Sequence, residues 1–504
     1  MKKLLTLMLT VILAVAACLG LTACGKEESA PTIDIMGSDY AELAEYVPDD
    51  FKIGFIFLHD EKSTYDLNFL NAAKEAVATM GLKSSQVVYK VNVPEGQECY
   101  DTAKEMVEDG CKAIFANSFG HGEFMLKAAK DFKDVQFFHA TGTQASNLPE
   151  GVTNFHNAFA SIYEGRYLGG VAAGLKLNEM LAEKAKAEGK KVEELSKEVI
   201  EAETKIGYVG AYPYAEVKSG YTSFYLGAKS VCPSVTMDVK FTNSWYDETA
   251  EKAAAEALIA DGAKLISQHA DSMGAPSACE KAGIPNVSYN GSTIEKCPNT
   301  FIISSRINWA PYFEMIIASF AEKENEDGKM EKFFEVPADY VGSIEDGMVE
   351  ILPINAEVMA EGTVAALKSV ISVFKRENSA AIVFNTENFT VAIPEEVDND
   401  EQRIYKEGDV TIVARKDKND KGETVETIIK KIDKDGRLLS YLADVIDEGD
   451  FKGETEVIIL DWENGCYFAE SKVGYEFDED YNLTGHTGRS APYFDIDIDG
   501  ITIK

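Results

Sequence analysis

The 504-residue sequence lacks the short motifs of the commonest catalytic sites. It contains no HExxH, no GxSxG and no GxxxxGK[ST], patterns that mark zinc peptidases, serine hydrolases and phosphate-binding loops. Its six histidines fall in no recognisable arrangement of nucleophile, base and orienting residue. We therefore predict that the chain is not an enzyme and uses no metal and no cofactor.

Basic residues are scarce relative to acidic ones. The sequence has 49 Lys and Arg against 85 Asp and Glu, which gives a formal net charge of −36. Such a charge repels phosphate backbones, and this excludes nucleic acid as an electrostatic partner. CxxC spacing is also absent. The sequence allows either disulfide bonds or buried free thiols for the remaining cysteines. These are Cys99, Cys111, Cys232, Cys279, Cys297 and Cys466.

Only one long hydrophobic run occurs, and it lies at the start of the chain. Two lysines precede an apolar run that ends at Leu21, and small residues then lead into Cys24. This pattern is typical of a bacterial lipobox, and the run is short for a membrane-spanning helix of about 20 apolar residues. We predict a lipoprotein signal peptide over 1–23, a lipid on Cys24 and a polar tether over 24–49. The lipid would anchor the protein at the extracytoplasmic face of the cell membrane.

From about 50 to 397, short β-branched or aromatic runs alternate with helical segments rich in Ala, Leu, Lys and Glu. A long apolar helix is predicted over 160–177, between two groups of strands. This rhythm predicts an α/β fold with two lobes, each built on a doubly wound parallel sheet. The predicted strands are 52–57, 86–91, 111–116, 135–138, 205–209, 236–241, 264–268, 286–289 and 301–305.

Two segments depart from this rhythm. Residues from about 178 to 204 are rich in Lys and Glu and predict an exposed helical insertion with i to i+4 charge pairs. Residues 398–504 alternate strand-like runs with turns such as NDKG and DKDG, which predicts a separate β-rich domain of unknown role. The run FDIDIDG at 494–500 matches the opening of a calcium-binding loop, but its twelfth position would fall beyond Lys504. An acidic edge strand is the favoured interpretation.

Ligands of parallel α/β sheets bind beyond the carboxyl ends of the strands. The residues that follow the predicted strands are unusually polar and aromatic, and they include Ser118, Phe119, Trp245, Asp271 and Asn290. Each has an alternative role, because polar residues after a strand often cap the next helix. The pattern indicates a small-molecule site between the two lobes.

Several ordered strings resemble the basic membrane lipoprotein (BMP, PnrA-like) family of ABC transporter substrate-binding lipoproteins. The resemblance implies a type I periplasmic-binding-protein fold with a hinge, and ABC permease subunits as partners. It also implies that the ligand is a purine nucleoside or purine base. The strings are HATGTQASN at 139–147, IYEGRYLGGVAAG at 162–174, KIGYVGAYPYAEVKSG at 205–220, TNSWYD at 242–247, SQHADS at 267–272, SYNGS at 288–292 and NWAPYF at 308–313.

A purine needs flat aromatic faces and a few fixed hydrogen-bonding groups. The first lobe could supply one face and Trp245 or Trp309 the other, although both tryptophans could instead pack the hinge. Asp271 is the expected acceptor for ribose hydroxyls or ring N–H groups. The predicted ligand-binding residues are Tyr65, Asn68, Ser118, Phe119, Trp245, Asp271, Asn290 and Trp309.

Two other functions stay open. The same architecture serves ligand-sensing surface receptors, and the cleft could hold another small polar solute. Neighbouring genes for permease and ATPase subunits would favour an importer over a receptor.

Overall fold

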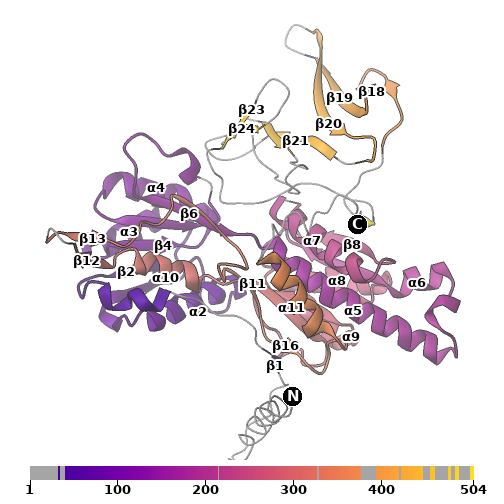
Figure 1. Ribbon diagram of the computed structural model, residues 1–504, viewed down its shortest axis with the longest axis horizontal. Helices are drawn as coiled ribbons and strands as arrows, with labels where there is room; N and C mark the ends of the chain where they lie inside the picture. Colours follow the sequence, from indigo (N-terminus) through magenta and orange to yellow (C-terminus); the bar gives the residue numbers. More distant parts are fainter. Residues whose placement is uncertain are drawn as a thin grey trace, which may run out of the picture.

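The computed structural model shows two α/β lobes side by side, with a β-rich segment next to them (Figure 1). This confirms the two-lobed α/β fold predicted from the sequence. Cys24 and most of the predicted tether lie outside the residues that the structure describes. Those residues are 32–33, 40–142, 144–213, 215–325, 328–375, 393–418, 422–436, 438–445, 455–459, 475–477, 483–486 and 500–504.

The first lobe is built on a six-stranded parallel sheet in the order β14-β6-β5-β4-β2-β3. Phe55 and Phe115 point to one apolar core, and Ile56 and Ile114 point to another on the opposite face. Both faces are therefore covered, as expected for parallel strands. The strands are β2 (Ile53–Ile56), β3 (Val87–Lys90), β4 (Ala113–Ala116), β5 (Gln136–Ala140), β6 (Phe155–Ala160) and β14 (Asp339–Gly342). The helices are α2 (Thr64–Thr79), α3 (Gln97–Glu108), α4 (Gly122–Asp131) and α10 (Ala310–Ala318).

Strand β6 was not predicted from the sequence, because it carries two polar residues in its FHNAFA run. Both are buried and hydrogen-bonded. The ring nitrogens of His156 each lie 3.0 Å from an oxygen, one on Pro337 and one on Gln136, and Asn157 Oδ1 accepts from the backbone N of Ala145 at 2.7 Å. Satisfied polar groups can occupy a buried strand at little cost.

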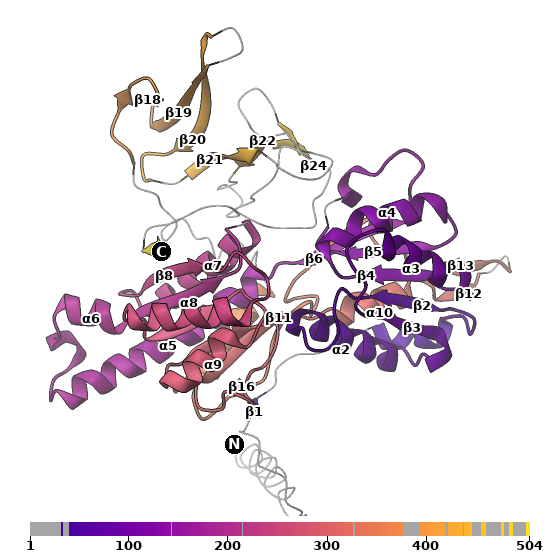
Figure 2. The same ribbon diagram turned by 180° about the vertical axis from the view of Figure 1, so that it is seen from behind.

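The second lobe is built on a seven-stranded sheet in the order β15-β11-β10-β9-β7-β8-β25, in which only β15 is antiparallel to its neighbour. Helix α5 packs beside α7, and α8 packs beside α9 (Figure 2). The strands are β7 (Lys205–Gly210), β8 (Thr236–Phe241), β9 (Leu265–Gln268), β10 (Asn286–Tyr289), β11 (Phe301–Ile307), β15 (Val349–Ile351) and β25 (Ile501–Ile503). The helices are α5 (Tyr163–Ala187), α7 (Ala215–Val231), α8 (Glu248–Ala260), α9 (Gly274–Ala282) and α11 (Thr363–Phe374).

The chain crosses between the lobes three times in the described residues. It leaves the first lobe from β6 into α5, returns from β11 into α10, and crosses again from β14 to β15. Helix α10 and strand β14 therefore belong to the first lobe although they come late in the sequence. These crossings form the hinge between the lobes.

The predicted insertion at 178–204 is helical and forms a small core of its own. It comprises the end of α5 and the short helix α6 (Lys197–Glu203). Leu181, Ala185 and Leu195 are buried together. Ion pairs at i to i+4 spacing join Lys184 to Glu188 and Lys197 to Glu201.

The tail contains an antiparallel sheet in the order β17 to β22. Among the strand-like runs of the predicted β-rich domain, VTIVAR at 410–415 falls in β19 and TEVII at 455–459 forms β22, whereas CYFAES at 466–471 lies outside the described residues. The strands are β17 (Val397–Asp398), β18 (Gln402–Glu407), β19 (Val410–Lys418), β20 (Thr424–Ile432), β21 (Leu438–Val445) and β22 (Thr455–Ile459).

The last strand of the chain, β25, belongs to the second lobe. It pairs in parallel with β8 at the edge of that sheet. The backbone N of Met237 donates to Gly500 O at 2.9 Å, and Lys504 N donates to Val239 O at 2.8 Å. The acidic residues of the FDIDIDG run, which precede Gly500, lie outside the described residues. The last strand of the predicted tail segment is therefore part of the second-lobe sheet.

Further short strands pair outside these sheets, and among them β23 (Tyr475–Phe477) pairs with β24 (Leu483–His486). Strand β1 (Thr32–Ile33) pairs with β16 (Ile354–Asn355), and β12 (Glu322–Glu324) pairs with β13 (Met330–Lys332). The five described cysteines are buried free thiols. Among the described helices, none has the length and apolar character needed to cross a membrane.

Candidate functional site

Asp66, in the first turn of α2, ties together two strand-end loops of the first lobe. Its side chain is buried. Oδ1 accepts from the backbone N of His59 at 3.0 Å and from Asn117 Nδ2 at 2.8 Å, and Oδ2 lies 3.2 Å from His59 Nδ1. Because His59 follows β2 and Asn117 follows β4, this carboxylate fixes neighbouring loops at the carboxyl edge of the sheet.

Tyr65 and Asn68 lie on the same helix in different surroundings. Tyr65 is partly exposed, and its hydroxyl donates to Asn117 O at 2.7 Å. Asn68 is buried, and its amide donates to Ile307 O at 2.8 Å and accepts from Arg306 at 3.3 Å. Since Arg306 and Ile307 belong to β11, Asn68 joins the lobes at the hinge. Its contact with a ligand stays a prediction.

Phe119 presents an exposed aromatic ring after β4, with 60% of its surface accessible. Its turn, η3 (Phe119–His121), is held by Glu95, whose carboxylate accepts from Ser118 Oγ and from Gly120 N. A Cβ on Gly120 would come within 2.5 Å of that carboxyl group, so a larger residue there would displace the Glu95 side chain. Ser118 itself is buried, and its contact with a ligand stays a prediction.

Aromatic side chains also follow the strands of the second lobe. Trp245 is 38% exposed, and its ring centroid lies 5.4 Å from that of Tyr212 and 6.4 Å from that of His269. The His269 ring in turn lies 4.6 Å from Tyr289. A row of aromatic rings therefore runs from the exposed Trp245 to the buried Tyr289.

Asp271 lies at the centre of the second-lobe loops. Its backbone N donates to Trp245 O at 3.0 Å, and its Oδ1 accepts from Asn290 Nδ2 at 2.9 Å. Burial raises the pKa of the Asp271 carboxyl to about 8, aided by the negative charges of Glu251, Glu216 and Asp66 and opposed by the Asn290 hydrogen bond. Such a shift at the end of a strand marks a candidate functional site.

Backbone strain concentrates at the same strand ends. The described non-glycine residues with positive φ are Asn92, Thr141, Asn243 and Asn290, at 57°, 64°, 55° and 61°. Each comes one or two residues after a parallel strand. This conformation is uncommon, and costly for the β-branched Thr141. Residues held in it cluster at ligand sites.

The strand-end residues of the two lobes act on each other electrostatically. Asp66 of the first lobe helps to raise the pKa of Asp271 in the second. Burial and the charges of Asp66, Glu216 and Asp271 raise the pKa of Tyr65 well above its ordinary value. The strand-end residues of the two lobes are therefore close enough for their charges to affect one another, and contact of Tyr65 or Asp271 with a ligand stays a prediction.

Asp66 and Glu216 were not among the predicted site residues. Asp66 directly follows Tyr65, and Glu216 lies in the string PYAEVKSG after β7. Acidic residues in the first turn of a helix are common for reasons of helix stability alone. Only the position of these helices at the carboxyl edges of the sheets distinguishes them.

Trp309 packs in the core of the first lobe. It is 1% exposed, and its ring stacks on Phe69 at 4.6 Å and 23°. It also lies 6.4 Å from Phe313 of the same helix region. The alternative packing role accounts for these contacts, and a contact between Trp309 and a ligand stays a prediction.

His139 and His269, which lie at strand ends, are buried, and both are uncharged at neutral pH. Burial lowers the pKa of His139 to about 4 and also lowers the pKa of His269. Within the described residues, no three His, Cys, Asp or Glu side chains are grouped so as to hold a metal ion.

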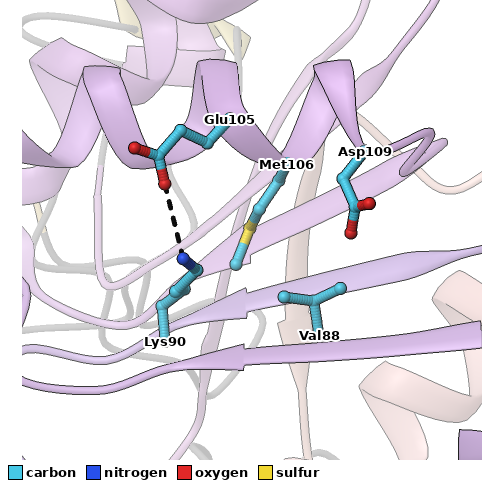
Figure 3. Close-up of a pocket in the computed structure, with 5 residues that line it drawn as sticks. All are labelled: Val88, Lys90, Glu105, Met106 and Asp109. Carbon is cyan, nitrogen blue, oxygen red and sulfur yellow. Dashed lines mark hydrogen bonds and ion pairs between the residues drawn. The ribbon is translucent and has the colours of Figure 1, made fainter. Parts of the chain in front are cut away.

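A separate surface pocket lies between strand β3 and helix α3 of the first lobe (Figure 3). It is lined by Val88, Lys90, Glu105, Met106 and Asp109, and a 3.4 Å ion pair joins Lys90 to Glu105. None of the predicted site residues lines it. The strand-end loops are therefore the better candidate site.

Several known proteins are similar to this chain. A family described as ABC transporter substrate-binding protein PnrA-like matches residues 55–361. A purine-binding protein of Brucella abortus is 33% identical over 273 residues, which cover 54% of this chain and 69% of that protein.

Two further likenesses extend the comparison. A Haloferax volcanii protein, provisionally named an ABC transporter glucose-binding protein, is 32% identical over 42% of this chain and 46% of its own. The structure of an ABC transporter solute-binding protein from Conexibacter woesei aligns with a TM-score of 0.48 at 16% identity, over 64% of this chain and 96% of that chain.

Proposed function

The chain belongs to the PnrA-like family of ABC transporter substrate-binding proteins, and we propose that it captures a purine nucleoside or purine base between its two lobes for an ABC importer. The permease subunits of that importer would be its protein partners. The observation that carries this proposal is the family match over residues 55–361, supported by exposed aromatic side chains after strands in both lobes, Phe119 and Trp245.

The flat faces that a purine requires are present on both lobes. Phe119 of the first lobe and Trp245 of the second are exposed although both are large and apolar. Exposed aromatic residues that follow strands offer stacking surfaces, each worth about 1 to 3 kcal/mol per base in nucleic-acid sites. Closure about the hinge would bring such surfaces onto a ligand from both sides.

The polar groups that fix orientation come mainly from the second lobe. Asp271 offers carboxylate oxygens to ribose hydroxyls or ring N–H groups, and Asn290 holds the carboxylate in place. Tyr65 adds a hydroxyl from the first lobe. A few placed polar groups among aromatic surfaces are typical of small-molecule sites.

The relatives support a purine more strongly than a sugar. The purine-binding protein of Brucella abortus matches a longer stretch at slightly higher identity than the Haloferax volcanii protein. A sugar remains the second candidate solute, because the Haloferax volcanii relative is named for glucose binding. A receptor role is the alternative to import.

We also propose that the protein is attached to the cell membrane by a lipid on Cys24, on the extracytoplasmic face. The support is the sequence from Leu21 to Gly25, which follows one apolar run and ends in small residues. Two acyl chains suffice for stable anchoring. Metabolic labelling with a fatty acid tests this directly, and an unlabelled chain would contradict it.

Calorimetric titration tests the ligand class. We expect adenosine, guanosine, inosine or their bases to bind more tightly than glucose. Asp271→Ala should cost about 2 to 4 kcal/mol of binding free energy, because it removes an acceptor from desolvated donors. Asp134→Ala, which alters an exposed loop carboxylate of the first lobe, is the control and should change nothing. Tighter binding of glucose than of any purine would overturn the ligand class.

A further inference from the structure

Glu216 occupies a distinctive position directly beyond β7. It lies in the first turn of α7, where the helix dipole favours a carboxylate. Its side chain is 24% exposed, and its Oε1 lies 3.5 Å from His269 Nε2. The Glu216 carboxylate therefore contacts His269 and is also partly exposed to solvent.

His269 is suited to orient Glu216 and has no other evident role. It is 1% exposed and neutral near pH 7, because burial lowers its pKa. Its Nδ1 has no hydrogen-bond partner in the described structure, and a Cβ on Gly220 would lie 2.8 Å from it. The tautomer with hydrogen on Nε2 directs its donor to Glu216.

Glu216 acts on residues of both lobes. Its charge helps to raise the pKa of Tyr65 in the first lobe, and of Tyr289 and Asp271 in the second. Its neighbour His269 lies beside Trp245 and Tyr289 and two residues before Asp271, so Glu216 belongs to the same group of strand-end residues as Asp271. Asp66 adds a carboxyl group from the first lobe, and its charge, like that of Glu216, helps to raise the pKa of Asp271.

Two arginines close to this region, Arg166 and Arg306, form hydrogen bonds with other protein groups. Arg166 is fully buried, and one terminal nitrogen donates to Tyr208 Oη at 2.8 Å and to Ser267 Oγ at 3.0 Å. Arg306 Nε donates to Glu350 at 2.6 Å. Neither guanidinium is placed to neutralise a ligand phosphate.

We infer that Glu216 is a second ligand-binding carboxylate, oriented by His269, and that with Asp271 it selects uncharged, donor-rich ligands over their phosphorylated counterparts. The inference rests on the proposed function, since it concerns the same site. A phosphate group would meet carboxylates from both lobes, and like charges brought together in an interface are strongly unfavourable. A nucleoside would instead donate N–H or O–H groups to them.

Titration of adenosine and adenosine 5′-monophosphate into four proteins tests the inference. The wild-type chain should bind adenosine about 100-fold more tightly than the monophosphate, or better. Glu216→Gln removes one charged acceptor, so its affinity for adenosine should fall about tenfold. The ratio of its affinities for adenosine and the monophosphate should also fall about tenfold. Glu216→Asp keeps the charge but shortens the side chain. Its binding of adenosine should therefore weaken, while its preference for adenosine over the monophosphate stays. Glu198→Gln on the remote helix α6 is the control for net charge and should match the wild type.

The outcomes separate the two proposals. The role of Glu216 would be overturned if Glu216→Gln changed neither the affinity for adenosine nor the ratio of the affinities for adenosine and the monophosphate. Purine capture would then still stand. Equal wild-type affinity for both ligands would overturn the selectivity. If the wild-type chain binds no purine nucleoside or base, the proposed function fails and this inference fails with it. Circular dichroism of each variant confirms that folding is retained.

Discussion

The amide of Asn290 donates to the carboxyl of Asp271 across 2.9 Å, which joins the residues that follow β10 and β9. Asn290 adopts positive φ to do so. Burial and three neighbouring carboxylates disfavour the charged form of Asp271, whereas this hydrogen bond favours it. The hydrogen bond from Asn290 thus holds the Asp271 carboxyl group where ionisation is unfavourable until a ligand supplies further hydrogen-bond donors.

We predict that ligand affinity increases with pH. The ligand's donors need the ionised carboxylate, and the Asp271 pKa is about 8. Affinity should therefore rise about tenfold per pH unit below that value and level off above it. Calorimetry with adenosine from pH 6 to pH 9 measures the slope. Asp271→Asn should bind weakly at every pH, and a wild-type affinity independent of pH would contradict this role of Asp271.

The raised pKa of Asp271 also predicts a lower free energy of unfolding for the ligand-free protein at higher pH. A carboxyl whose folded pKa is raised binds a proton in the folded state that the unfolded chain has already lost. Stability is therefore lost as pH rises from near the ordinary value of 3.8 towards about 8. Asp271→Asn lacks this loss, so its melting temperature should exceed that of the wild type more at pH 8 than at pH 5. Asp134→Asn serves as control, and a difference that is the same at both pH values would argue against the shift.

Glu95 is expected to act on ligand binding through Phe119. Phe119→Ala should weaken purine binding about 5- to 150-fold through loss of a stacking face. Glu95→Gln should loosen the turn that carries the ring, and so weaken binding less. In the Phe119→Ala background, Glu95→Gln should have no further effect, because the group it positions is gone. Additive losses in this double-mutant cycle would show that Glu95 acts by another route.

Gly500 is predicted to be critical for docking the last strand. It has φ of +95°, and a Cβ there would lie 1.9 Å from the Tyr225 hydroxyl. Gly500→Ala should therefore lower the melting temperature clearly. Gly422→Ala is the matched control, since it also has positive φ but meets no atom within 4 Å. Equal effects of the two substitutions would mean that β25 contributes little.

A chain that ends at Val397 loses strand β25 along with the tail sheet. We expect it to be less stable, because Met237 N and Lys504 no longer form their backbone bonds at the edge of the second lobe. Its purine affinity should be unchanged, because β25 pairs at the outer edge of the sheet, away from β9 and β10. Affinity lost in a chain that is still folded would show that the tail completes the site.

Most of the fold follows from local sequence signals. The β-branched runs of strands such as β7 and β11 are bounded by polar loops, and they identify both strands and their carboxyl ends. Strand β6 is missed because its polar residues find partners only in the tertiary structure, such as Pro337. The assignment of α10 to the first lobe is also missed, since a helix buried along its whole length carries no sign of which sheet it covers.

The candidate site could be predicted in part for the same reason. Asp271 and Trp245 follow strands directly, so the direction of the strand places them at the correct edge. Asn68 and Trp309 lie on or next to helices, where one residue of helical phase decides between the interlobe space and the core. Packing in the tertiary structure decides which helix face lies in the core, and no local sequence pattern shows this.

The central claim is that a purine is held between the two lobes by groups that include Asp271. Small-angle X-ray scattering of the ligand-free protein and of the protein saturated with adenosine or guanosine tests it most directly. We predict a smaller radius of gyration with ligand for the wild type, because the lobes close on the base, and no change for Asp271→Ala at the same concentration. Scattering profiles of the wild type that are identical with and without saturating purine would contradict the account.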